Sequence, residues 1–239
     1  MIDLSIRSYE PELMDDFSSE GAVINQTLRE LENVNVYLGG NGLSIKALKK
    51  IIFASNLKEC TIADLGCGGG YTMMHMADWA KKNAIKVQLT GVDANPNIIA
   101  FAEKNSVNYK NISYQSKDIF STYFQNQQFD VIHCSLFTHH FTDEELIALF
   151  TIWSKQANTA VIINDLHRHT ISYYFTIWVI RALSKSEMVR YDSVLSVKRA
   201  FKHKELIGIM EKAGISNYSL KWKWAFRWEL IISCGTKSQ

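Results

Sequence analysis

Short apolar runs alternate with amphipathic stretches through the middle of the chain. Five apolar runs have the length of buried strands and lie at residues 60–65, 87–93, 112–118, 129–136 and 159–165. Stretches with helical spacing occupy residues 71–82, 95–105 and 142–156. Strands that alternate with helices pair in parallel through right-handed crossovers. The pattern therefore predicts an open α/β sheet with helices on both faces, whose ligands lie at the carboxyl ends of the strands.

Two of these expected helices carry start signals. Asn95 is a good cap for a helix that begins with Pro96, a residue that suits the first helical turn. Thr142 can cap the helix that follows it, and the acidic residues of its first turn suit the helix dipole.

The two ends of the chain have different patterns. Apolar residues between Ile24 and Val34 recur at helical spacing and predict a helix that stops at Gly39, with a second helix over 44–54. Residues 170–183 and 202–214 are also expected to be helical. The last stretch then alternates large apolar and polar residues, which predicts two antiparallel strands with a turn near Ala225.

Length, charge and cysteine usage limit the classes of function. A chain of 239 residues is long enough for one well-buried domain, and a net charge of +2 requires neither a nucleic-acid nor a membrane partner. The four cysteines form no CxxC pair, so neither a zinc site nor a disulfide framework is expected. The sequence starts without a secretory-signal pattern and its longest apolar stretch is too short for a membrane span. We expect a cytoplasmic protein with no integral membrane segment.

The stretch IADLGCGGGYT, residues 62–72, is the strongest local motif. Glycines after a strand let a ligand approach the backbone closely, although they also serve simply as turn formers. A phosphate loop needs a lysine and then a serine or threonine after its last glycine, and this stretch has no lysine until Lys81. The dinucleotide pattern GxGxxG also fails, because its third glycine is missing. The motif present is an acid followed by glycines at alternate positions: Asp64, Gly66, Gly68 and Gly70.

This motif resembles the first motif of the class I S-adenosylmethionine-dependent methyltransferases, Asp/Glu-x-Gly-x-Gly-x-Gly. The chain looks most similar to the small-molecule branch that includes the ubiquinone and menaquinone methyltransferases. The resemblance covers residues 60–165 and continues more weakly over 196–214. It implies a Rossmann-like sheet of seven mostly parallel strands with an antiparallel C-terminal hairpin. Residues 1–56 would be an N-terminal helical lid of the same domain, and residues 57–239 the methyltransferase domain, with a helical acceptor-pocket segment near 167–200.

The resemblance implies S-adenosylmethionine as cofactor, with S-adenosylhomocysteine as product, and a role for each cofactor-binding position. The glycine turn would hold the amino-acid tail, with Asp64 suited to its ammonium group. Asp93 would accept hydrogen bonds from both ribose hydroxyls, and Asp118 would accept from the adenine amino group. Each of these acids could instead be a simple turn former. The full set implied is Asp64, Leu65, Gly66, Gly68, Gly70, Asp93, Ala94, Asp118, Ile119, Cys134 and Ser135.

Candidate bases follow the fourth and fifth expected strands. They are His139, His140, Asp165 and His167, with His167 preferred. Asp165 would orient the His167 imidazole if the segment is extended or irregular, but would not face it on a helix. His140 could instead fix its loop, and Asp165 could instead cap a helix. No metal is expected, because no acidic residue is fixed at ligand spacing from these histidines.

The apolar, aromatic N-terminal and 170–183 segments suit a hydrophobic acceptor. We expect a methyltransferase that acts on an aromatic or polyketide-like small molecule, by O-methylation or, next, C-methylation. The alternative is a non-catalytic module that binds S-adenosylmethionine or S-adenosylhomocysteine. An NAD-dependent oxidoreductase and a nucleic-acid methyltransferase are disfavoured by the glycine spacing and by the mild charge. A monomer or homodimer is expected.

Overall fold

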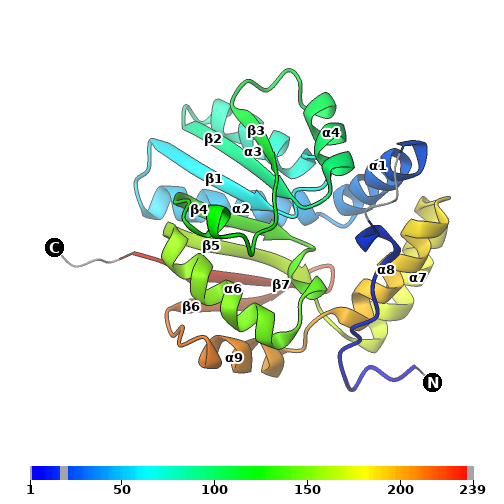
Figure 1. Ribbon diagram of the computed structural model, residues 1–239. Coiled ribbons are helices and arrows are strands. Elements are labelled where there is room, and N and C mark those ends of the chain that lie inside the picture. Colours follow the sequence, from blue (N-terminus) through cyan, green and yellow to red (C-terminus); the bar gives the residue numbers. More distant parts are fainter. Residues whose placement is uncertain (1, 17–20, 236–239) are drawn as a thin grey trace.

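The computed structural model describes residues 2–16 and 21–235 and contains a seven-stranded sheet (Figure 1). The strand order is β3-β2-β1-β4-β5-β7-β6. The strands are β1 (Glu59–Leu65), β2 (Lys86–Asp93), β3 (Ile112–Ser116), β4 (Phe129–Ser135), β5 (Ala157–Leu166), β6 (Tyr218–Lys223) and β7 (Arg227–Ser233). The first five pair in parallel, whereas β7 is antiparallel to both β5 and β6. The predicted Rossmann-like sheet with a C-terminal hairpin is confirmed.

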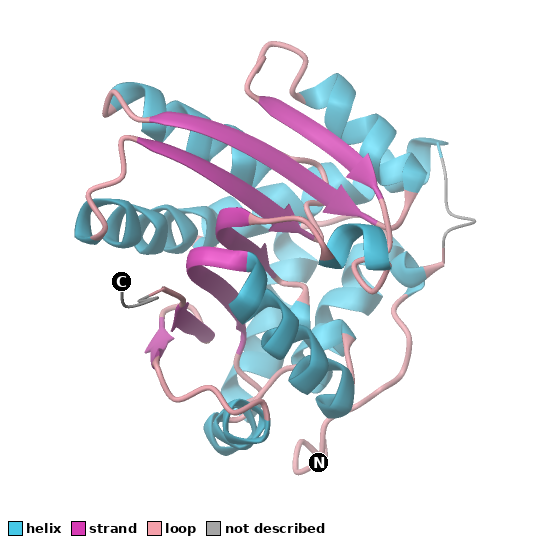
Figure 2. Ribbon diagram, turned by 60° about the vertical axis from the view of Figure 1, so that its left-hand side comes forward, coloured by secondary structure: helices cyan, strands magenta, loops and turns pink. Residues whose placement is uncertain are grey.

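Helices cover both faces of the sheet and its carboxyl edge (Figures 1 and 2). The longer ones are α1 (Gly21–Tyr37), α2 (Gly40–Ala54), α3 (Tyr71–Lys82), α4 (Pro96–Asn105), α6 (Asp143–Gln156), α7 (Thr170–Leu183), α8 (Glu187–Arg199) and α9 (His203–Lys212). The shorter ones are the 3-10 turns η1 (Leu13–Asp15) and η2 (Thr138–His140) and the single turn α5 (Thr122–Gln125). None of the helices in the described part of the chain is both long and apolar enough to cross a membrane.

Two apolar layers flank the sheet because alternate strand residues face opposite sides. Ala63 and Leu65 of β1 face one layer, where α6 and α9 pack around the fully buried Trp153. Ile62 of β1 faces the other layer with Leu48 of α2 and the methionines of α3. The expected lid helix α2 is thus part of the sheet's own core. The role of residues 1–56 as a lid and the division at residue 56 stay predictions, and residues 1, 17–20 and 236–239 lie outside the described residues.

The remaining helices gather beyond the carboxyl ends of the strands, at the right of Figure 1. Val34 of α1 packs with Ile180 of α7 and Val189 of α8. Leu28 of α1 packs instead against α4. The N-terminal segment runs along α8, where the Ser8 amide donates to the Lys198 carbonyl. These helices therefore form a wall that faces the strand ends. The strand order changes direction between β1 and β4, because β2 and β3 lie on one side of β1 and β4 and β5 on the other.

The largest difference from the expected elements is α8. The sequence predicted only an unspecified helical segment there, since the apolar residues of α8 do not gather on one side. Its buried positions include Val189 and Leu195 but also Asp192, Ser196 and Arg199. Those polar residues bind the N-terminal segment, which explains a burial that periodicity alone does not reveal.

The start of α6 provides a test of local helix chemistry. Thr142 accepts from the Glu145 amide while Glu145 accepts from the Thr142 amide, which is a capping box. We predict that Thr142→Ala lowers the free energy of unfolding by about 0.5–2 kcal/mol, since a helix donor loses its acceptor. Urea unfolding measures the change. Thr142→Ser retains the hydroxyl and should stay near the wild-type value; an equal loss in both variants would contradict the capping role.

Candidate functional site

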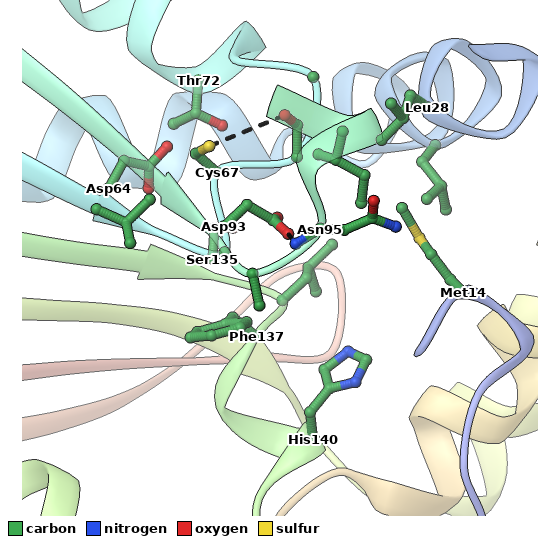
Figure 3. Close-up of a pocket in the computed structure, with 18 of the residues that line it drawn as sticks. Met14, Leu28, Asp64, Cys67, Thr72, Asp93, Asn95, Ser135, Phe137 and His140 are labelled. Carbon is green, nitrogen blue, oxygen red and sulfur yellow. Dashed lines mark hydrogen bonds between the residues drawn. The ribbon is translucent and has the colours of Figure 1, made fainter. Parts of the chain in front are cut away.

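A cavity of about 440 Å³ opens at the carboxyl ends of the central strands. The glycine turn after β1, the end of β2, the loops after β3 and β4, helix α1 and the N-terminal segment all contribute to its wall. Figure 3 shows Asp64, Cys67 and Thr72 on one side, with Met14 and His140 reaching toward the same space from other elements. The cavity lies at the position where an open α/β sheet binds its ligand.

The glycine turn forms one wall of this cavity. The amides of Gly66 and Cys67 both donate to the Val92 carbonyl of β2, at 2.9 and 3.2 Å. Gly66, Gly68 and Gly70 all have positive φ, a conformation that residues with a Cβ rarely adopt. A Cβ on Gly66 would lie 2.2 Å from the Phe137 ring, whereas one on Gly68 would meet only Leu28 at 3.8 Å. Gly66 is therefore required by packing, and Gly68 by backbone conformation.

Asp64 lies at the floor of the cavity and has a protein partner. Its carboxylate is 2.6 Å from Nδ1 of His133, and Nε2 of that histidine is 2.8 Å from the Ser44 hydroxyl of α2. Asp64 and His133 are 3 and 0% exposed. His133 was not among the residues that the sequence predicted for the site. The structure makes it the residue that holds Asp64 in place.

Asp93 and Asp118 lie at the ends of β2 and β3 and both line the cavity. The Asp93 carboxylate accepts from the Asn95 amide at 3.0 Å. Burial raises the pKa of Asp93 to about 6, although main-chain donors, including that amide, oppose the shift. Asn95 is fully buried, and its Nδ2 has no hydrogen-bond partner among the described residues. Figure 3 shows its side chain in the cavity beside Asp93. This pair offers an acceptor and a free donor to one ligand.

The other predicted cofactor residues divide into lining and supporting positions. The lining ones are Gly66, Gly68, Ala94, Ile119 and Ser135. Leu65 and Cys134 are buried in the apolar layer under α6, and neither lines the cavity. Gly70 caps α3 and lies against Tyr114, where a Cβ would be 2.2 Å from the phenol oxygen. These three residues shape the wall from behind it.

Helix α1 supplies lining residues that the sequence analysis missed. Leu28, Leu31, Glu32 and Asn35 face the cavity from one side of the helix. A buried amide network connects this side to α2, since Asn41 Nδ2 donates to Glu32 at 2.9 Å and Asn35 Nδ2 donates to Asn41 at 2.6 Å. Leu28 and Leu31 have the helical spacing that is typical of buried core residues. The sequence alone therefore cannot distinguish a role at a site from core packing. The buried asparagines are the only local signal.

Of the four predicted bases, His140 alone lines the cavity. Its Nδ1 is 2.9 Å from the Asp15 carboxylate. His139 is buried behind it, with Nδ1 2.7 Å from Asp165. Burial by itself would lower the pKa of His139, but the carboxylates of Asp165 and Glu12 outweigh it and raise the pKa to about 9. The same interaction outweighs the burial of Asp165 and holds the pKa of that carboxyl well below its usual range.

The expected pairing of Asp165 with His167 is wrong. Asp165 accepts from the Thr138 hydroxyl and from the amides of His139 and Leu166, so its oxygens are directed into η2 and its own backbone. His167 accepts from the Trp222 indole at 3.2 Å, beside the C-terminal hairpin, and does not line the cavity. Burial and the nearby His169 and Arg168 lower the pKa of His167 to about 4. It is neutral and weakly basic near pH 7.

One set of side chains in the described residues fits a metal ion. Glu12, His139 and His140 each offer a ligand atom, and the three atoms lie within 4.8 Å of one another. Glu12 could not be assigned to these histidines from the sequence, because strands β1 to β4 lie between them along the chain. Only the packing of η1 against η2 brings it there.

The two glycines allow a paired prediction on the cavity wall. We predict that Gly66→Ala lowers the free energy of unfolding by about 2–5 kcal/mol, the sum of a positive-φ cost and the displacement of Phe137. Gly68→Ala has only the backbone cost and should lose about 1–2 kcal/mol. Urea unfolding of both variants beside the wild type measures the difference. An equal loss in both would show that Phe137 does not determine the requirement at position 66.

Comparison with known proteins agrees with this geometry. Residues 62–157 match the family described as a methyltransferase domain. None of the curated protein sequences matches the chain.

Three solved structures are representative of those with a similar fold. The plantazolicin methyltransferase bound to S-adenosylhomocysteine has a TM-score of 0.65 at 15% identity, over 90% of this chain and 95% of its own. Human N-acetylserotonin methyltransferase bound to S-adenosylmethionine also scores 0.65 at 15% identity, over 96% of this chain and 60% of its own. Magnesium protoporphyrin IX methyltransferase from Synechocystis PCC 6803 has a TM-score of 0.56 at 15% identity, over 84% of this chain and 87% of its own. The methyltransferase-domain match over residues 62–157, the shared fold and the motif geometry identify the chain as an S-adenosylmethionine-dependent methyltransferase, with S-adenosylmethionine as the methyl donor.

Proposed function

We propose that this methyltransferase transfers a methyl group from S-adenosylmethionine to an oxygen of a hydrophobic, aromatic or polyketide-like small molecule. One observation carries the proposal: a single cavity joins the polar strand ends to an apolar wall from α1 and the N-terminal segment. The first part suits a nucleoside with a charged tail, and the second an apolar acceptor. The family's small-molecule branch that includes the ubiquinone and menaquinone enzymes is the proposed affiliation, and the cytoplasmic location and monomeric or dimeric state stay predictions.

The cavity residues fit the cofactor from one end to the other. Asp93 would accept from the ribose hydroxyls, and the unpartnered Nδ2 of Asn95 would donate to the same sugar. Asp118 and the neighbouring Ile119 would bind the adenine. The methionine tail would lie along Gly66–Gly68, where Asp64 and Glu32 are the carboxylates that line the wall. Since Asp64 is already paired with His133, Glu32 is a second candidate partner for the ammonium group.

The sulfonium would lie near Ser135 and Phe137, where β4 ends. A positive charge is stabilised by an adjacent aromatic ring. Methyl transfer is a displacement in which the acceptor oxygen bonds to carbon while the carbon–sulfur electrons return to sulfur. Holding the oxygen in line with that bond supplies much of the rate acceleration. Shape and position are therefore the main tasks of this wall.

The acceptor side of the cavity is mostly apolar. Met14, Leu28, Leu31, Phe120 and Phe141 line it. His140 is the histidine that lines the cavity, and with Asp15 on its Nδ1 the Nε2 is the ring atom left for a proton or another cation. The plantazolicin and N-acetylserotonin enzymes carry small molecules in their names, which supports an acceptor of that size class.

We predict that calorimetric titration of the purified protein will show binding of S-adenosylmethionine and S-adenosylhomocysteine and none of NAD. Asp93→Ala should weaken binding by roughly 10–100-fold, since two hydrogen bonds to a charged acceptor are lost. Asp130→Ala is the matched control: that aspartate lies at the other end of β4, beside Thr61, and its loss should leave binding unchanged. Methyl transfer from labelled cofactor to a panel of phenols then identifies the acceptor. Binding of NAD alone, or cofactor binding that survives Asp93→Ala, would refute the assignment.

The raised pKa of Asp93 predicts a pH dependence of cofactor affinity. Below about pH 6 the carboxyl is neutral, and its protonated oxygen becomes a donor that no longer accepts from a ribose hydroxyl. Affinity for S-adenosylhomocysteine should therefore fall as pH decreases, by about tenfold between pH 7 and pH 5. Titration at several pH values measures this. Asp93→Asn removes the ionisable group and should give a flat profile over the same range; an unchanged slope in that variant would assign the dependence to another group.

A further inference from the structure

The Glu12, His139 and His140 side chains come together where η1 packs on η2. Glu12 Oε1 is 3.5 Å from His139 Nε2, and Glu12 Oε2 is 3.8 Å from His140 Nε2. The two imidazole rings are tilted neighbours with centroids 4.6 Å apart. Glu12 and His139 are buried, and His140 is partly exposed to the cavity.

These separations lie at or beyond the upper limit for a hydrogen bond and suit two ligands of one ion. His139 Nε2 has no hydrogen-bond partner among the described residues, although it is completely enclosed. A buried polar atom without a partner is costly, so such atoms are rare in native structures. A tetrahedral zinc ion with bonds of about 2.0–2.2 Å places its ligand atoms about 3.4 Å apart. The two Glu12–histidine distances are close to that value.

The other nitrogen of each ring is already fixed by a carboxylate. Asp165 lies 2.7 Å from His139 Nδ1, and Asp15 lies 2.9 Å from His140 Nδ1. In the metal-bound state the ring proton would lie on Nδ1, and the lone pair of each Nε2 would point toward the ion beside Glu12. A metal-binding histidine almost always donates its second N–H to such a carboxylate or carbonyl, which fixes its tautomer and orientation.

The nearby arginines do not neutralise Glu12. Arg7 donates to Asp143 and to the carbonyls of Phe141 and Arg199. Arg199 donates to Asp15 and to the carbonyls of Glu10 and His140. Among the described contacts neither guanidinium donates to Glu12. The Glu12 carboxylate accepts from the Ser196 hydroxyl at 2.8 Å, and its oxygens also face the two imidazoles.

We propose that Glu12, His139 and His140 form a binding site for a divalent transition metal of the zinc class. Two imidazoles and one carboxylate favour zinc and its first-row neighbours, whereas magnesium and calcium prefer oxygen ligands alone. Three protein ligands leave a fourth position for water or another oxygen ligand. The ion joins the N-terminal segment to the loop after β4 at the cavity wall, so it holds Met14 and Asp15 in place there.

The proposed ion replaces a proton as the cation on His140 Nε2. A nitrogen that coordinates a metal does not accept a proton, so His140 acts in this state as a ligand and not as a base. This inference needs only the geometry of η1 and η2. It is independent of the proposed acceptor and of the cofactor assignment.

The experiment uses the full chain purified without a polyhistidine tag. The protein is stripped with a chelator, titrated with Zn²⁺ by calorimetry, and loaded with Co²⁺ for visible absorption. We expect one Zn²⁺ per chain, the absorption bands of low-coordinate cobalt with nitrogen and oxygen ligands, and no comparable binding of Mg²⁺. S-adenosylhomocysteine titration of the stripped protein, done in parallel, tests the cofactor assignment separately.

Three variants decide whether the ion is held at this place. Glu12→Gln and His140→Gln each remove one ligand and should abolish stoichiometric Zn²⁺ binding and the cobalt spectrum. Asp15→Asn changes only the partner of His140 and should weaken Zn²⁺ binding by about 10–100-fold. His75→Gln is the matched control, because His75 is an exposed histidine beside a single glutamate, Glu32, at 3.4 Å.

Circular dichroism shows whether each variant is folded, and two independent ligand variants keep the test decisive if one is not. The site is overturned if the wild-type chain binds no stoichiometric Zn²⁺, or if folded Glu12→Gln or His140→Gln retains it.

Discussion

The buried contact between Asp64 and His133 determines where the cavity can form. It joins the carboxyl end of β1 to β4 at the point where the strand order reverses, and through Ser44 it includes α2. Removing one member of a buried hydrogen-bonded pair costs about 1–3 kcal/mol or more, because the other is left without a partner. The contact therefore fixes the floor on which the glycine turn rests. Residues 69 positions apart make this contact, so the position of Asp64 depends on long-range packing.

Local patterns explain how much of the fold was predictable. The strands, the capped helices at Asn95 and Thr142, and the hairpin around Ala225 follow from periodicity and turn chemistry within a few residues. Helix α8 was not resolved from sequence because its polar buried face is complementary to the N-terminal segment, far away in the chain. Burial of Asp192 by the amides of Leu13 and Met14 is a tertiary effect with no local signature.

The residues of the candidate site also divide into those that the sequence predicted and those that depend on tertiary packing. Asp93 and Asp118 were predicted from the resemblance, and both line the cavity because the ends of parallel strands meet at one edge. The Asp165–His167 pairing was inferred from spacing alone and failed, because the carboxylate is satisfied by η2 and the imidazole by the hairpin. Glu32 and Asn35 were missed because they reach the cavity from α1, and Glu12 because it reaches His139 and His140 from the distant N-terminal segment. Side-chain chemistry there depends on which face the packing turns inward.

The N-terminal segment has a double constraint that follows from this arrangement. Met14 and Asp15 line the cavity, while Glu12 beside them is buried against the two histidines of η2. Any displacement of η1 that opens the apolar wall also separates Glu12 from His139 and His140. The position of Met14 and Asp15 in the cavity wall is thereby coupled to the contacts of a buried carboxylate. The polar strand ends have no such coupling, since the glycine turn is held by β2 and by the Asp64–His133 contact. A cofactor can thus bind to a preformed surface while the wall opposite it depends on the state of Glu12 and the two histidines.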